Sequence, residues 1–358
     1  MESMLHTDIC RILGITYPVL LAGMAGGPTT PELVAAVSKA GGLGTFGAAY
    51  MEPEAIRQAI RRVRELTDQS FAVNLFAVDL TDDTTHVREM QAVLDPLREQ
   101  LGIEPGAQNV RTADRFAEQL NVLFEEQVPV ISTAFGLLSA EAMQRAHDAG
   151  IKVIAMATTV KEAMAAEKHG VHIVVAQGSD AGGHRGTWDT TAHPMGANIG
   201  TFSLVPQMVD AVHIPVVAAG GIMDGRGLAA ALMLGASGVQ LGTRFLTAAE
   251  SGAHPVYQRA LLGSTEEDTV ITRAFSGRPA RGVRNAFIEH VESSEMEPLS
   301  FPTQNTVTGD IRRAAAAQNN EQYMSLWAGQ ATRMLTDQEE ASSILTQIVT
   351  AAGKLLEK

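Results

Sequence analysis

The chain has 358 residues, of which 45% are hydrophobic, and 40 acidic side chains against 27 Lys and Arg give a formal net charge of −13. This length suits an α/β barrel, which takes about 250 residues in one domain, with one smaller unit added. The acidic balance argues against nucleic acid and anionic membrane surfaces as partners, because both are bound through clustered Lys and Arg.

Cys10 is the single cysteine of the sequence. One cysteine allows no disulfide framework, no thiolate zinc site and no redox pair, and we expect no metal site. The N-terminal residues include acidic side chains, and no apolar run approaches the roughly 18 residues of a membrane span. We therefore expect a soluble, cytoplasmic protein.

Short apolar runs alternate with helical patterns along the first 250 residues. Thr30 before Pro31 marks one helix start, and Thr159 with Glu162 forms a capping box for another. Eight alternating βα units favour a TIM (β/α)8 barrel over an open doubly wound sheet. The predicted strands cover residues 18–24, 43–49, 71–78, 128–135, 152–157, 173–177, 214–218 and 238–241.

Two segments interrupt this alternation. Residues 79–127 show two helical patterns without a strand, and residues 251–320 are richer in Arg, Ser and Pro. We predict a barrel over residues 1–250 plus 321–358, with residues 251–320 as an inserted, smaller, mostly helical substrate-side domain. The amphipathic pattern over residues 339–356 predicts a final helix that returns to the barrel wall.

The stretch IVVAQGSDAGGHRG, residues 173–186, joins a buried strand to a glycine-rich turn around one histidine. Gln177 closes the strand, and the glycines let the backbone approach a bound molecule. We expect His184 to project from this polar loop, so that truncating it costs less than about 1 kcal/mol of stability. Asn74, a lone amide in an apolar strand, must find partners or face a ligand. His172, beside a helix-to-strand turn, is expected to be structural or solvated.

Two further strand ends are rich in glycine. AAGGI, residues 218–222, follows the seventh predicted strand, and LGTRF, residues 241–245, follows the eighth. In TIM barrels a phosphate commonly binds at these two loops, because backbone N–H groups converge there on an anion. A helix that starts near Asp224 would add its dipole. We therefore predict a phosphate-bearing cofactor at these loops, held by Gly220, Gly221, Gly242 and Thr243.

Seven motifs occur in order along nearly the whole chain: LAGMAGG, FAVNLF, AQGSDAGGHRG, VVAAGGIMDGRG, QLGTRF, SGRPARG and YMSLWAGQ. Together they resemble the nitronate monooxygenase family, formerly called 2-nitropropane dioxygenases, in its class I form. The resemblance implies an FMN-bearing TIM barrel with an inserted substrate-side domain.

The resemblance also implies roles for individual residues. His184 takes the place of the family's active-site histidine. The flavin is placed over Ala22, Gly23, Met24, Asn74 and Gln177. The phosphate is placed at the glycine loops, at Gly183, Gly220, Gly221, Gly242 and Thr243, and Gly182 is a further cofactor-binding residue.

The implied reaction is the oxidation of an alkyl nitronate of the propionate 3-nitronate type with molecular oxygen, by electron transfer from the nitronate to FMN. A histidine over the ring can hold the nitro oxygens when protonated, or take the α-proton of a nitroalkane when neutral. The expected partners are a small nitronate or nitroalkane and oxygen, with a homodimer as a candidate assembly. Two alternatives stay open: an FMN-dependent, NAD(P)H-using reductase of the enoyl-acyl-carrier-protein or quinone type, and a non-catalytic flavin-binding protein.

Several positions depart from the family pattern. Leu21 and Gly23 stand where many members have Gln and Pro at the flavin edge, and Ala134 lies in a strand end where well-studied members carry a second histidine. These members also place tyrosines and a lysine around the stretch that here contains Phe301, Asn305 and Gly309. The departures predict a pocket that is less basic and less phenolic.

Overall fold

Eight parallel strands form one sheet in the computed structural model, which describes residues 4–357. They are β1 (Val19–Leu21), β2 (Gly44–Gly47), β3 (Phe71–Phe76), β4 (Val130–Ala134), β5 (Lys152–Ala157), β6 (Ile173–Gln177), β8 (Val216–Ala219) and β9 (Gly238–Leu241). Their order is β1-β9-β8-β6-β5-β4-β3-β2, and the two ends of this order meet as well. Leu21 N donates to Leu43 O, and Leu43 N donates to Val19 O, each at 2.9 Å. The sheet is thereby closed, and the predicted TIM (β/α)8 barrel is confirmed.

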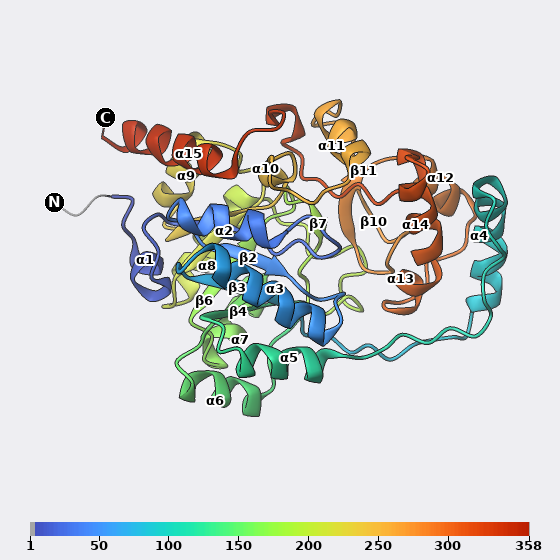
Figure 1. Cartoon of the computed structure of the whole chain (residues 1–358), viewed down its shortest axis with the longest axis horizontal. Helices are drawn as coiled ribbons and strands as arrows, with labels where there is room; N and C mark the ends of the chain where they lie inside the picture. The colour runs from blue at the N-terminus through green and yellow to red at the C-terminus, as the bar shows by residue number, and fades with distance from the viewer. Residues whose placement is uncertain (1–3, 358) are drawn as a thin grey trace.

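Helices surround the barrel, and the first of them precedes β1 and packs in one apolar cluster with the strand residues Leu20, Val130 and Ile173 (Figure 1). They are α1 (Asp8–Leu13), α2 (Pro31–Lys39), α3 (Pro53–Leu66), α5 (Phe116–Glu125), α6 (Ala140–Asp148), α7 (Val160–Lys168), α8 (Thr201–Ala211), α9 (Gly225–Met233), α10 (Thr243–Leu246) and α15 (Ala341–Leu356). The last of these packs against α9 and α2. Gly225 allows that approach, because a Cβ there would lie 2.5 Å from the Ala352 nitrogen. The predicted return of the final helix to the barrel wall is confirmed.

Local sequence signals explain where several elements begin. The helix starts predicted at Thr30 and Thr159 are confirmed, since each hydroxyl accepts a hydrogen bond from a backbone N–H of the first turn. The strand expected from residue 128 starts only at Val130, after Pro129. Pro215 delays the strand expected from residue 214 in the same way. Proline has no N–H to donate to the sheet, so both strands begin after it.

A second group of elements covers the C-terminal ends of the barrel strands. It comprises α4 (Val87–Leu101), α11 (Pro255–Leu262), β10 (Thr269–Thr272), β11 (Ala280–Val283), α12 (Ala286–Ser293), α13 (Thr303–Val307), α14 (Gly309–Ala317) and the short turns η1 (Glu321–Tyr323) and η2 (Thr332–Met334). Two long connections carry α4 to the far end of the molecule, beyond α12 and α14 (Figure 1). There Met90 and Leu94 join the same apolar cluster as Phe287 and Ile311. The domain division stays a prediction, and this packing would place α4 with residues 251–320.

A short strand, β7 (Gly183–His184), ties the barrel to this second group. It pairs antiparallel with β11, with His184 opposite Ala280 and Gly183 opposite Arg281. The expectation that His184 projects from a loop is therefore wrong, because a backbone ladder holds it. The partner strand lies far along the chain, so the glycine-rich stretch itself gives no sign of the pairing.

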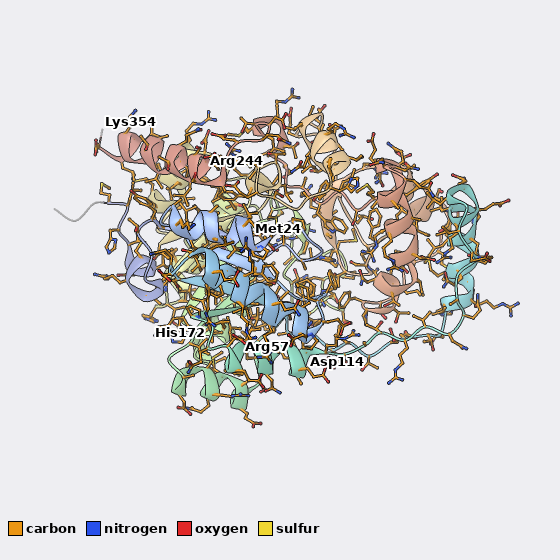
Figure 2. The ribbon with its side chains drawn as sticks, viewed as in Figure 1. Met24, Arg57, Asp114, His172, Arg244 and Lys354 are labelled. Carbon is orange, nitrogen blue, oxygen red and sulfur yellow. The ribbon has the colours of Figure 1, made fainter. Side chains whose placement is uncertain are left out.

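His172 has the structural role predicted for it. Its Nδ1 accepts from Val153 N at 3.1 Å, which holds the ring against β5. Burial, with the charges of Lys152 and His147, lowers the pKa of His172 from 6.5 to about 4. The residue lies well away from Met24, which is near the middle of the molecule (Figure 2).

Three observations concern the described chain as a whole. Cys10 is buried and free. No helix within residues 4–357 combines the length and the apolar character needed to cross a membrane. In the same residues, no group of three or more His, Cys, Asp or Glu side chains is arranged to hold a metal ion.

Candidate active site

A cavity of about 1030 Å³ lies at the C-terminal ends of the barrel strands. β1 ends at Leu21, earlier than predicted, because residues 22–26 leave the sheet and line this cavity. The structure brings all the predicted site residues to one wall: Ala22, Gly23, Met24, Asn74, Gln177, Gly182, Gly183, His184, Gly220, Gly221, Gly242 and Thr243. Their individual roles stay predictions.

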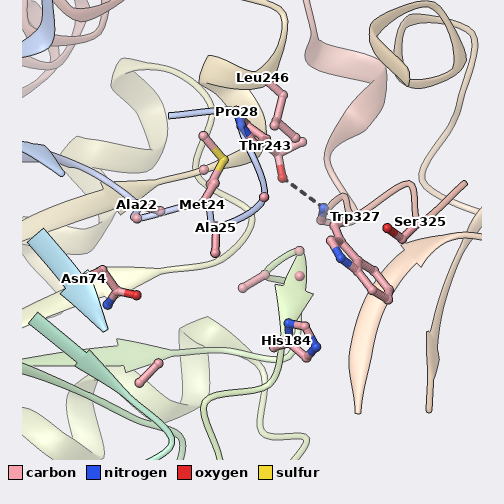
Figure 3. Close-up of a pocket in the computed structure, with 18 of the residues that line it drawn as sticks. Ala22, Met24, Ala25, Pro28, Asn74, His184, Thr243, Leu246, Ser325 and Trp327 are labelled. Carbon is pink, nitrogen blue, oxygen red and sulfur yellow. Dashed lines mark hydrogen bonds between the residues drawn. The ribbon is translucent and has the colours of Figure 1, made fainter. Parts of the chain in front are cut away.

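The glycine loops after β8 and β9 carry backbone N–H groups with nothing to bind. The amides of Gly220, Gly221 and Gly242 donate to no other residue of the described chain. Gly220 and Gly221 have φ angles of +121° and +69°, a region that favours glycine. Beside them, Thr243 Oγ1 accepts from Gly329 N at 3.0 Å (Figure 3). Unpaired N–H groups on a cavity wall can bind an oxyanion such as phosphate.

The helix that follows these loops has a carboxylate at its N-terminus. α9 does begin beside Asp224, but the Asp224 carboxylate accepts from Arg226 N at 2.9 Å and pairs with the Arg226 guanidinium at 2.6 Å. A carboxylate therefore already occupies the positive end of this helix. The dipole contribution to phosphate binding therefore stays a prediction, and the free glycine amides are the donors that line the cavity.

The side-chain amide of Asn74 has one hydrogen-bond partner, and its carbonyl oxygen has none within the described residues. Its Nδ2 donates to Ser132 Oγ at 2.7 Å. Its carbonyl oxygen receives no hydrogen bond from residues 4–357 and points toward the cavity (Figure 3). Gly23 packs directly on this residue, since a Cβ on Gly23 would lie 2.5 Å from Asn74 Cβ. Glycine is therefore required where the 22–26 segment lies against β3.

Gln177 is 4% exposed, and both ends of its amide bind the His184 segment. Nε2 donates to His184 O at 2.9 Å, and Oε1 accepts from Gly186 N at 2.7 Å. The last residue of β6 thus fixes the position of β7. Gln177 is a positioning residue for His184, in addition to its predicted place beside the flavin.

Aromatic rings enclose His184 on the cavity wall. The ring centroid of His184 lies 6.2 Å from that of Phe76, 5.6 Å from that of Phe135 and 5.5 Å from that of Trp327. Figure 3 shows His184 on β7 with Trp327 beside it. These rings replace water around much of the imidazole, although the side chain stays partly accessible because it lines the cavity.

Ser276 sets the protonation pattern of the His184 ring. The Ser276 hydroxyl donates to Arg278 O at 3.2 Å, and His184 Nε2 lies 2.8 Å from the same hydroxyl oxygen. A hydroxyl has one proton to donate, so when the Ser276 proton is on Arg278 O the proton of the second hydrogen bond belongs to Nε2. Nδ1, which has no partner within the described residues, then keeps its lone pair.

His184 is neutral near pH 7. Burial, with the positive charges of Arg278 and Arg312, lowers the pKa of His184 from 6.5 to about 3. The Arg278 guanidinium lies 4.1 Å above the Phe135 ring, within the same cluster. Of the two protonation states considered for this histidine, the structure favours the neutral one. A neutral imidazole can accept a proton from a bound molecule.

Several arginines around the cavity form no ion pair with any residue of the described chain. Their guanidinium groups bind backbone carbonyl groups instead, as in Arg185, Arg278, Arg281 and Arg312. Arg312 also lines the cavity together with Tyr50. The prediction of a pocket less basic and less phenolic than in other family members stays a prediction, because Arg312 and Tyr50 are not among the positions that it compared. Unpaired cations at a cavity favour an anionic ligand.

Some of the residues around His184 had no role assigned from the sequence. Ser276 and Arg278 belong to the SGRPARG segment, and Trp327 belongs to YMSLWAGQ, so the motifs were the available signal. Phe135 had no such signal. Its φ of +72° is rare for a bulky side chain, and backbone strain of this kind clusters at functional sites.

Together, the closed barrel, the cavity above its strand ends and the histidine on the cavity wall are typical of an α/β-barrel enzyme, whose reaction site is expected at the C-terminal face of the sheet. The family model for nitronate monooxygenase matches residues 6–351. The chain belongs to the nitronate monooxygenase family and is an oxidoreductase.

Similar proteins span the whole chain. It is 44% identical over 355 residues to a protein of Staphylococcus saprophyticus described as a probable nitronate monooxygenase, with 99% of both chains covered. It is similar to the solved nitroalkane oxidase from Streptomyces ansochromogenes, with a TM-score of 0.91 and 37% identity over 98% of this chain and 99% of that one. FabK from Thermotoga maritima has a TM-score of 0.78 and 31% identity, with 98% and 97% covered.

Proposed function

We propose that this protein oxidises small alkyl nitronates, and nitroalkanes that it first deprotonates, with molecular oxygen and bound FMN. The observation that carries the proposal is the neutral, enclosed His184 beside a cavity with unpaired arginines. Such a histidine can take a proton from carbon, and fixed positive charges stabilise the anion that remains. Membership of the nitronate monooxygenase family and the likeness to a nitroalkane oxidase support this substrate class.

The residues on the cavity wall fit FMN. The free amides of Gly220, Gly221 and Gly242 suit one phosphate group, and Gly183 leaves room beside them, since a Cβ there would meet nothing within 4 Å. The Asn74 carbonyl offers an acceptor to the ring system. When bound, FMN supplies the electron acceptor for the nitronate and returns the electrons to oxygen.

His184 Nδ1 is the proposed base. Because Nε2 donates to Ser276, the lone pair on Nδ1 is available for the α-proton of a nitroalkane. Loss of that proton places negative charge on the nitro oxygens. Arg278 and Arg312, whose charges act on His184, stabilise the same negative charge. A preformed nitronate needs no proton removal and depends on His184 only for orientation.

A flavin-dependent, NAD(P)H-using reductase is the second candidate, because FabK shares this fold. Anaerobic mixing of the purified protein with a nitronate, NADH or NADPH, followed by flavin absorbance, separates the two functions. Bleaching by the nitronate alone supports the proposal, whereas bleaching only by a reduced nicotinamide identifies a reductase. No change with any of the three would indicate a non-catalytic binding protein. Mass spectrometry of the released chromophore is expected to identify FMN, and FAD would contradict the single-phosphate site.

A further inference from the structure

Phe135 directly follows β4 in a tight turn with an unusual backbone. Its φ of +72° lies in the left-handed region, which a bulky side chain rarely adopts. On one side of the turn, Ala77 N donates to Ala134 O at 2.9 Å. On the other side, Thr133 Oγ1 donates to Gly136 O at 2.9 Å. A Cβ on Gly136 would lie 2.4 Å from Ala77 O, so the turn packs closely on the end of β3. These contacts hold Phe135 in its strained conformation.

The Phe135 side chain is buried among other aromatic rings at the active site. Its ring centroid lies 4.6 Å from that of Phe76 and 6.1 Å from that of Phe301. The His184 ring lies 5.6 Å away, and the two planes make an angle of 82°, an arrangement that aromatic pairs favour. Phe76 belongs to the barrel and Phe301 to the segment that covers it. The Phe135 ring is therefore held by both parts of the molecule.

The Arg278 guanidinium contacts the same Phe135 ring. Its Cζ lies 4.1 Å from the ring centroid, which is a cation–π contact. Arg278 is buried, and its Nη2 donates to Thr187 O. Its Nε has no hydrogen-bond partner in the described chain. A buried donor without a partner costs free energy, so this N–H would be stabilised by any acceptor within reach.

An acceptor without a partner lies close by, on His184. Nδ1 of this residue receives no hydrogen bond from residues 4–357, and its Nε2 is paired with Ser276. Burial, followed by the charge of Arg278, lowers the pKa of His184, so the cation is near enough to act on the ring. No hydrogen bond joins Arg278 to His184 in the described chain, and both side chains contact Phe135 instead.

We propose that Phe135 is a positioning residue, whose ring keeps the Arg278 guanidinium from binding His184 Nδ1. The lone pair of Nδ1 then stays free to take a proton. The charge of Arg278 stays close enough to stabilise the anion that remains. The inference rests on the proposed function for the role of Nδ1 as the base. It accounts for the strained backbone at residue 135, which places the ring against both groups.

The first test is the side-chain ¹⁵N NMR spectrum of the holoenzyme, which needs no substrate. Comparison with His184→Asn identifies the His184 signals. The wild-type protein should show Nδ1 as an unprotonated nitrogen without a hydrogen bond. Phe135→Leu keeps an apolar side chain but removes the ring. In this variant Arg278 should donate to Nδ1, and the Nδ1 signal should move toward that of a hydrogen-bonded nitrogen.

Phe135→Asn provides a second variant without the ring. Asparagine adopts the left-handed backbone more readily than leucine, so this variant decides the question if Phe135→Leu does not fold. The same shift of the Nδ1 signal is expected. Phe135→Tyr keeps the ring and should retain the wild-type signals. In the double variant Phe135→Leu with Arg278→Met, the Nδ1 signal should return to that of a free nitrogen.

Steady-state kinetics provide the second test. In Phe135→Leu, kcat on a neutral nitroalkane should fall by about 10- to 100-fold, because the base is occupied and displaced. Its KM and the rate with a preformed nitronate should change little, since neither depends on removal of the α-proton. Phe135→Tyr should restore kcat. A loss of packing alone would instead lower the FMN content and affect both substrates alike.

The matched control is a second contact of an arginine with a phenylalanine ring, on the outside of the barrel. Arg145 Cζ lies 4.0 Å from the ring centroid of Phe124, which is buried in α5. Phe124→Leu removes the same kind of contact far along the chain from His184. It should leave the His184 signals and kcat at their wild-type values.

The possible results lead to distinct conclusions. Unchanged His184 signals in both Phe135→Leu and Phe135→Asn overturn the positioning role. A shifted Nδ1 signal that persists in the double variant overturns the assignment of Arg278 as the donor. An Nδ1 that binds Arg278 without the ring, in a protein whose flavin no nitronate bleaches, supports the positioning role while the proposed function fails. Bleaching by nitronates with unchanged signals supports the function and overturns the positioning role.

Discussion

The side-chain amide of Gln177 donates to the backbone carbonyl of His184 at 2.9 Å. Through this bond, the end of a barrel strand determines where the proposed base stands. The same amide accepts from Gly186 N, so the whole β7 segment is attached to the barrel through one buried side chain. Rigid support of this kind matters because a displacement of about 1 Å in a reacting group can cost roughly 100-fold in rate.

Gln177→Leu should therefore lower kcat on nitroalkanes by about 10- to 100-fold. It leaves a buried carbonyl and a buried N–H unpaired, at about 1–3 kcal/mol each. Steady-state kinetics, FMN content and the melting temperature measure the three effects separately. Gln144→Leu, on the exposed face of α6, is the control and should leave all three unchanged. Wild-type kinetics in Gln177→Leu would show that the bond does not position the base.

His184→Asn should keep FMN while kcat/KM on a neutral nitroalkane falls by roughly 10²–10⁴-fold. The loss should be smaller with the preformed nitronate, which has no α-proton to give up. The stability cost should exceed the sequence-based expectation and reach about 1–3 kcal/mol, because the ring contacts and the Ser276 bond are lost. Oxidation of nitroalkane at the wild-type rate would show that another group is the base.

The pH dependence of stability reports on the two neutral histidines. His184 has a folded-state pKa of about 3, against 6.5 for the free side chain, and His172 has one of about 4. As the pH falls below 6.5, the two histidines bind protons in the unfolded chain but not in the folded protein, so the folded protein becomes less stable. The contribution of His184 is thus complete above pH 6.5 and is lost progressively between pH 6.5 and 3.

Denaturant unfolding between pH 8 and 4 measures this slope, which is about 1.4 kcal/mol per pH unit for each proton. His184→Asn should reduce the loss of unfolding free energy between pH 6.5 and 4. His172→Gln should reduce it over the same range, because the folded-state pKa of His172 is about 4. Identical slopes in all three proteins would mean that neither histidine is held neutral.

Gly242→Leu should yield folded apoprotein. A Cβ at Gly242 meets its nearest neighbours, Ala22 and Met24, at 3.4 Å and beyond, so the backbone accepts a side chain. The rest of the leucine would fill the space through which the amide reaches a phosphate. Gly263→Leu, at an exposed helix end, is the control and should retain the wild-type FMN content. Full FMN occupancy in Gly242→Leu would place the phosphate elsewhere.

Arg98→Ala should destabilise the protein by about 1–3 kcal/mol, since it removes a buried guanidinium and its hydrogen bonds, while its partner Asp310 is 38% exposed and can be hydrated. Arg98 is 1% exposed and joins α4 to α14 through Asp310 and to α13 through Val307 O. Urea unfolding measures the change, and Arg88→Ala on the exposed face of α4 should cost less than about 0.5 kcal/mol. Equal effects of the two substitutions would show that α4 does not depend on the ion pair.

Much of the barrel could be predicted because its signals are local. Runs such as 173–177 are apolar over a strand length, and helix starts such as Thr159 carry their own capping groups. The prediction of a ligand site at the glycine loops came from the rule that ligands bind at the C-terminal ends of barrel strands. The need of Asn74 for a hydrogen-bond partner or a ligand was also predictable, because it is a lone amide among apolar residues.

The rest depended on contacts between distant parts of the chain. The pairing of His184 with Ala280 joins segments almost a hundred residues apart, and neither segment shows an alternating pattern. The low pKa of His184 arises from burial and from arginines that only the fold brings near.

The β7–β11 ladder joins the proposed base, His184, to the segment that covers the barrel. If residues 251–320 swung away as a rigid lid, they would carry His184 with them or break the ladder. For protein engineering, a cover segment grafted from a relative would change the placement of the base together with the choice of substrate.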